Sequence, residues 1–175
     1  DFTNTFRGLG ALADPDGAVR TAALRALEGR DVRCAVAVRA LNDPWPHARL
    51  QAIALLRGCG DRQETLLEIA SGLPMKGDGW HAPAAALLAL RGTGRVDETL
   101  LDRYATHPVW QVRMYAARAA NERLLWPLRV LSADSMPNVR QAAITRLLEL
   151  GEREAAAEAA VVALQHSDDP QLLMA

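Results

Sequence analysis

A short segment that recurs along the 175-residue chain constrains its fold more than any other feature. Each regular copy starts at an Asp or His, places an Arg six residues later, and continues with a run of Ala and Leu. Four regular copies begin at Asp14, Asp43, His107 and Asp134. A degenerate copy begins at Gly77 and a last one begins at residue 169, so the mean spacing is about 31 residues. A period in this range is typical of helical solenoids.

Each copy predicts two helices joined by a turn. An Asp in the turn can cap the open N–H groups of the second helix, and Pro suits the first turn of that helix. Apolar residues recur at helical spacing around and after the Arg, as in Val19, Ala22, Ala23, Ala26 and Leu27. Half of the chain is hydrophobic but 5% of it is aromatic, so the apolar mass is Ala, Leu and Val. This composition favours helix packing over strands.

The boundaries of the helices follow from the same pattern. The first helix of each pair is predicted over residues 31–42, 61–72, 95–106, 123–133 and 153–167, with another before residue 13. Glycines are expected to end four of the second helices: Gly29, Gly58, Gly92 and Gly151.

These residues resemble the HEAT repeat, in which a turn Asp is followed by Val-Arg and then by spaced Ala and Leu. The short period resembles the bacterial variety named for phycobilisome lyases, and Pro127 resembles the proline found in many first helices of that family. The resemblance covers essentially the whole chain. It implies an all-α fold, a right-handed α-solenoid of about five to six helix pairs, as a single domain over residues 1–175 that is part of a longer protein. His107 in place of Asp and Pro83 in place of Arg depart from the pattern.

Charge and cysteine content restrict the class of protein. The chain has 20 basic and 21 acidic residues, with Lys76 as its one lysine, whereas proteins that bind nucleic acid usually carry a strong basic excess. Cys34 and Cys59 are 25 residues apart, which matches neither a disulfide framework nor a metal site, and both are predicted to be small buried residues. A reduced chain of this kind predicts a cytoplasmic location. No stretch of 18 uncharged apolar residues predicts a membrane span.

The charged residues of the repeat are predicted to have a structural role. In stacked repeats the turn Asp and the helix Arg recur at the same height, so they are expected to form a ladder of hydrogen-bonded ion pairs between neighbouring units. The alternative is a row of arginines that binds phosphates or carboxylates. The ladder residues are Asp14, Arg20, Asp43, Arg49, Arg113, Asp134 and Arg140.

Two further sets of residues are candidates for binding. Trp45, Trp80 and Trp110 lie in turns, where they are expected to pack over neighbouring helix ends or, alternatively, to stack on bases or grip a peptide. The second of these sets is placed by helix periodicity on the concave face of the second helices, with apolar residues beside arginines. This set predicts a groove for an amphipathic helix or an acidic peptide, with a solvated face as the alternative: Leu50, Arg57, Leu88, Arg91, Met114 and Arg118.

No catalytic motif is present in the sequence. The four histidines, His47, His81, His107 and His166, form no metal-binding pattern, and no nucleophile elbow or phosphate-binding loop occurs. We therefore predict a non-enzymatic scaffold that binds a protein or peptide partner through its concave face, with no cofactor and no metal. The alternatives are a HEAT-like DNA-binding protein or DNA glycosylase, and a structural or regulatory domain of a larger enzyme.

Overall fold

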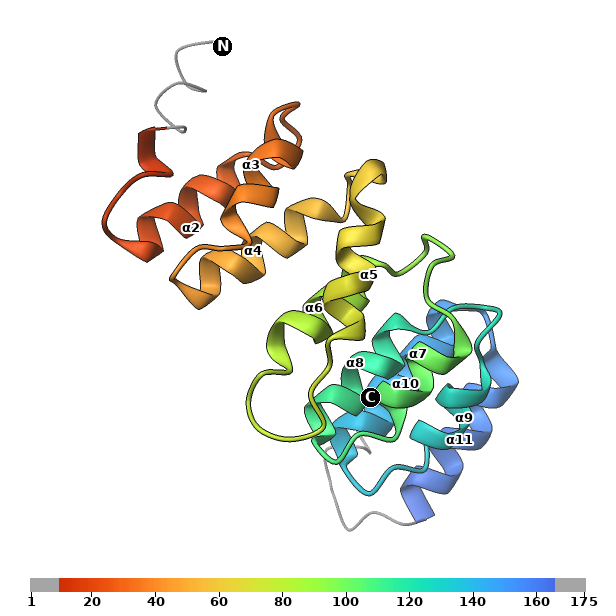
Figure 1. Cartoon of the computed structure of the whole chain (residues 1–175). Coiled ribbons are helices and arrows are strands. Elements are labelled where there is room, and N and C mark those ends of the chain that lie inside the picture. The colour runs from red at the N-terminus through yellow and green to blue at the C-terminus, as the bar shows by residue number, and fades with distance from the viewer. Residues whose placement is uncertain (1–9, 166–175) are drawn as a thin grey trace. The chain divides into compact units, whose positions relative to one another are not determined.

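The structure is a computed structural model that describes residues 10–165 (Figure 1). In this part of the chain the regular elements are α-helices and one short 3₁₀ helix, without any strand, so the all-α prediction is confirmed for it. The predicted last copy at Asp169 and the histidine at position 166 lie outside the described residues. No helix between residues 10 and 165 is both long enough and apolar enough to cross a bilayer.

The chain divides into two compact units, and the first consists of Asp1–Pro74 and Asp78–Leu90. The second helices of its three copies, α2, α4 and α6, pack beside one another, while α3 packs on α4 and α5 packs on α6 (Figure 1). Leu24, Ile53, Leu56 and Leu87 fill the core between them. The elements are α2 Gly17–Ala26, α3 Arg33–Ala40, α4 Pro46–Leu56, the 3₁₀ helix η1 Gly60–Arg62, α5 Gln63–Ser71 and α6 His81–Ala89.

The second unit consists of Met75–Gly77 and Arg91–Ala175. Its central helix is α10, which packs against α8, α9 and α11, and α7 packs on α8 (Figure 1). Leu101, Tyr104, Leu128 and Leu147 are fully buried in its core. The elements are α7 Glu98–Ala105, α8 Trp110–Ala119, α9 Trp126–Leu131, α10 Pro137–Glu149 and α11 Arg153–Gln165.

Local signals set where these helices start, and most first helices are shorter than predicted. The side chain of Asp97 accepts a hydrogen bond from the Leu100 N–H at 2.7 Å, so α7 starts at Glu98 rather than at residue 95. Pro127 occupies the first turn of α9, where its lack of an N–H is tolerated.

Three of the four glycines predicted to end second helices, Gly29, Gly92 and Gly151, have a left-handed φ, whereas Gly58 does not. Gly151 has a φ of 83° and completes a C-terminal motif in which the Glu152 N–H donates to the Leu147 carbonyl at 2.9 Å. α4 ends at Leu56 with Arg57 as its cap, so the predicted helix end at Gly58 is confirmed, but Gly58 has no left-handed φ. A Cβ at Gly58 would instead lie 2.7 Å from Nη2 of Arg33, and a glycine leaves room for that guanidinium.

Candidate functional site

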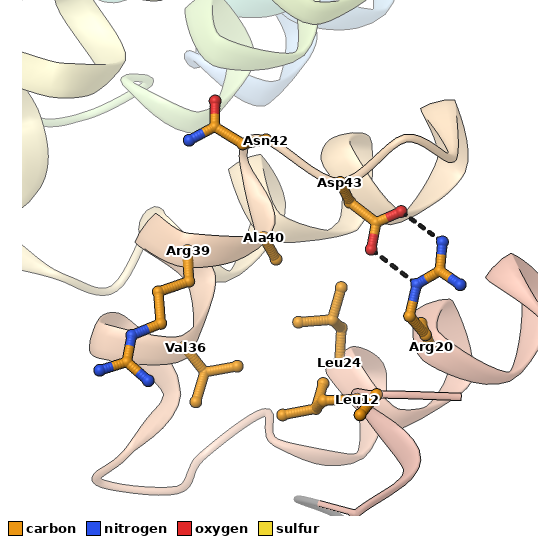
Figure 2. A pocket seen from close by; sticks show the side chains of 9 residues that line it. Leu12, Arg20, Leu24, Val36, Arg39, Ala40, Asn42 and Asp43 are labelled. Atoms are coloured by element: carbon orange, nitrogen blue, oxygen red, sulfur yellow. Dashed lines mark hydrogen bonds and ion pairs between the residues drawn. The ribbon is translucent and has the colours of Figure 1, made fainter. Parts of the chain in front are cut away.

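The arginine of the first copy bonds both its own turn and the turn of the next copy. Arg20 donates from Nε and Nη2 to the two carboxylate oxygens of Asp43, at 2.8 and 2.7 Å (Figure 2). Its Nη1 donates to the carbonyls of Asp14 and Pro15, at 2.7 and 3.0 Å. The paired side chains are 12% and 11% exposed. A bidentate pair of this kind fixes both the distance and the orientation of neighbouring copies.

The same arrangement occurs in the second unit. Arg113 donates from Nε and Nη2 to Asp134 at 2.6 and 2.9 Å, and its Nη1 donates to the carbonyls of His107 and Pro108 at 2.9 and 3.2 Å. The Asp134 carboxylate also accepts the Met136 N–H at 2.8 Å, which caps its own turn. Each aspartate therefore stabilises its turn and binds the preceding copy.

The electrostatics keep these aspartates charged. The hydrogen bond from Arg20 lowers the pKa of Asp43 and outweighs the opposing effect of desolvation. For Asp134 desolvation is the largest influence and raises the pKa, but the hydrogen bonds from Arg113 and the Met136 N–H together with nearby arginines leave it below its ordinary value. Since Arg20 and Arg113 are used in these pairs, they are not available as a row of phosphate-binding groups.

Two departures from the repeat sequence together remove both partners of one Arg-to-Asp pair. Pro83 stands where the third copy would have its arginine, and His107 stands where the fourth would have its aspartate. Buried His107 keeps the capping role, since its Nδ1 accepts the Val109 N–H at 3.1 Å, but it cannot replace a carboxylate in an ion pair. Leu90 is the last residue of the first unit, and it lies between these two positions in the sequence.

The three turn tryptophans differ from one another in their contacts and exposure. Trp45 covers the start of α2 while 43% of it stays exposed. Trp80 stacks on His81 with ring centroids 3.8 Å apart, and Trp110 is half-buried at the first position of α8. Trp45 and Trp80 belong to the first unit and Trp110 belongs to the second, so neither unit contains all three tryptophans.

We expect Gly17→Ala to destabilise the protein by about 1 kcal/mol, although Ala ordinarily improves a helix. A Cβ at Gly17 would lie 2.6 Å from Cβ and 2.7 Å from Cδ2 of Trp45, so the indole must move away from the helix end. Urea denaturation measures the change in the free energy of unfolding. Exposed Ala22 on the same helix provides the control, because Ala22→Ser should cost less than Gly17→Ala. Stabilisation by Gly17→Ala would show that Trp45 does not pack there.

The predicted concave-face residues are distributed over both units. Leu50, Arg57 and Leu88 lie in the first unit, where Arg57 is exposed and the two leucines are half-buried. In the second unit Arg118 is exposed and Met114 is half-buried, while Arg91 forms an ion pair with Glu149 at 3.7 Å. Neither unit therefore contains all six residues of the predicted groove.

The predicted residue Arg57 lines a hollow of about 430 Å³ in the first unit. Arg57 is exposed and forms no ion pair with the part of the chain that is described, whereas Arg33 donates from Nη2 to the Gly58 carbonyl at 2.9 Å. Sequence reasoning missed Arg33 because its position in the hollow depends on how two antiparallel helices pack. The lining residues are Glu28, Gly29, Arg33, Gln51, Ala54, Leu55, Arg57 and Gly58.

The prediction that the cysteines are unpaired is wrong, because Cys34 and Cys59 form a disulfide with their Cα atoms 5.8 Å apart. α3 and α4 pack as an antiparallel pair, so the first turn of α3 lies beside the segment that follows α4. A spacing of 25 residues does not reveal this proximity unless the helix pairing is known. Disulfides persist in oxidising compartments, so the argument for a cytoplasmic location, which assumed a reduced chain, no longer holds.

Neither a metal-binding cluster in the described residues nor a similar known protein points to a particular chemistry. Within residues 10–165 no three His, Cys, Asp or Glu side chains are grouped to hold a metal ion. No protein-family model and no curated protein sequence matches the chain.

Proposed function

We propose that the chain is a non-enzymatic binding module for a protein partner, built as a right-handed α-solenoid of HEAT-like helix pairs. The side-by-side packing of α2, α4 and α6 in the first unit supports this architecture, as does the packing of α8 on α10 in the second. The Arg-to-Asp pairs between consecutive copies support it further. Stacked helix pairs expose long surfaces that commonly bind other proteins.

The hollow around Arg57 is the observation that carries this proposal. Arg57 offers a charged guanidinium with no carboxylate bound to it among the described residues, and exposed Ala54 provides a small apolar surface beside it. The guanidinium suits the carboxylate of an acidic segment, which it can bind with two hydrogen bonds. Glu28 also lines the hollow and would repel a second carboxylate, so a segment with one acidic residue fits better than one with several.

Affinity capture from a lysate of the source organism, followed by titration with peptides from the captured protein, tests the proposal. We expect Arg57→Ala to weaken binding of a peptide with an acidic residue by at least tenfold, since an ion pair with two hydrogen bonds is lost. Arg129→Ala removes an equally charged, exposed side chain on α9 and serves as the matched control. Equal binding by both variants would contradict the proposed site. Capture of nucleic acid in place of protein would favour the DNA-binding alternative.

A further inference from the structure

A second hollow, of about 280 Å³, lies between α10, α11 and the turn that precedes α10. The Arg140 side chain lines this hollow and is buried, since the residue is 8% exposed. Its Nε is fully buried and has no hydrogen-bond acceptor among the described residues. A buried charged donor without an acceptor is costly, and such groups in native proteins are nearly always satisfied.

The two complete pairs show which kind of acceptor Arg140 lacks. Like Arg20 and Arg113, Arg140 donates from Nη1 to two carbonyls of its own turn, those of Asp134 and Ser135 at 2.8 and 3.1 Å. In the other two arginines Nε donates to an aspartate of the next copy. The geometry of Arg140 is therefore that of a complete pair without its carboxylate.

Arg49 makes the same bonds to its own turn as Arg140 but is less buried. Its Nη1 also donates to its own turn, to the carbonyls of Asp43 and Pro44 at 2.7 and 3.1 Å. The next copy begins at Gly77, which has no carboxylate, and Arg49 is correspondingly more exposed than Arg140. Water can satisfy Arg49, whereas the buried Nε of Arg140 needs a specific acceptor.

The sequence supplies an aspartate in the matching register. Val162 lines the Arg140 hollow as Val36 lines the hollow beside Arg20 in Figure 2. Asp43 follows Val36 by seven residues, and Asp169 follows Val162 by seven residues. Each of these aspartates directly precedes a proline. The residues Leu172, Leu173 and Met174 that follow this proline are apolar, and α11 exposes the apolar side chains of Val161 and Leu164.

We propose that the hollow at Arg140 is a docking site for the segment that begins at Asp169, whose carboxylate accepts the Nε–H of Arg140. Asp169 lies outside the described residues. The occupant is the Asp169-Pro170 segment of this same chain, which would extend the series of Arg-to-Asp pairs by one copy. The inference concerns the second unit and does not depend on the proposed partner site at Arg57.

Nuclear magnetic resonance of the arginine Nε–H groups tests this assignment in the full 175-residue chain. In the wild type we expect the Nε–H signals of Arg140, Arg20 and Arg113 to lie together at low field, because each proton is bonded to a carboxylate. Asp169→Asn should move the Arg140 signal alone toward that of Arg49. Asp168→Asn changes the same charge one residue away and should leave the signal in place.

Thermal unfolding provides a second measurement. We expect Asp169→Asn to lower the Tm by about 3 °C or more in the wild type and to have no effect in an Arg140→Gln background. The proposal is overturned if Asp169→Asn leaves the Arg140 signal unchanged or if Asp168→Asn moves it equally. It is also overturned if the signal depends on protein concentration, which would assign the hollow to a second copy of the chain.

Discussion

Replacing both cysteines by alanine is expected to lower the free energy of unfolding by about 3 kcal/mol. The Cys34–Cys59 disulfide joins residues 25 positions apart, and closing a loop of this length removes conformational freedom mainly from the unfolded chain. The effect should be confined to the first unit, which contains both cysteines. Alanine is preferred to serine because Cys59 is 2% exposed and a buried hydroxyl would add its own cost.

Amide hydrogen exchange of the oxidised wild type and the Cys34→Ala/Cys59→Ala variant measures this change unit by unit. Protection should fall in α3 and α4 and stay constant in α8 and α10. A thiol reductant is the control, because it should lower the stability of the wild type to that of the variant and leave the variant unchanged. If the reduced and oxidised wild type are equally stable, the disulfide does not contribute to the fold.

Asp134→Ala is expected to cost about 2–3 kcal/mol. The substitution removes both carboxylate bonds to Arg113 and the bond from the Met136 N–H, and it leaves a guanidinium that is 15% exposed without its partner. Urea denaturation monitored in the second unit gives the loss. Glu122→Ala is the matched control, because it removes an exposed carboxylate from the same unit.

An Arg113→Ala/Asp134→Ala double variant separates the pair from the cap. If the two residues act together, the double variant loses less stability than the sum of the single losses. Strict additivity would mean that Asp134 acts through its turn alone.

The sequence predicted the helices because each copy carries its own local signals. The Asp of the turn, the proline near the helix start and the spaced Ala and Leu all act within a few residues, so they can be recognised without a structure. The predicted first helices were too long where a local cap intervened, as at Asp97. The helix end at Gly58 was predicted but the reason for a glycine there was not, because a glycine near a helix end can serve either backbone geometry or space.

The candidate site was predictable only in part. Helical periodicity predicted Arg57 as a binding residue on the concave face, and the structure places it at a hollow. The partners that shape this hollow come from another helix, so Arg33 and the disulfide beside it had no signal in the local pattern. Arg140 shows the same limit, since its sequence context matches that of Arg49 and only packing buries it.

The disulfide also simplifies the chemistry of the chain in solution. The sequence contains two cysteines and they are bonded to each other, so oxidation of a single chain admits one intramolecular pairing and no mispaired isomer. The oxidised protein consequently has no thiol that reacts with a maleimide. A cysteine introduced at an exposed position such as Arg118 would then be the one site available for a fluorophore or a spin label, provided that the native bond is kept intact. Distances between the two units become measurable by pairs of such labels without removing the native cysteines.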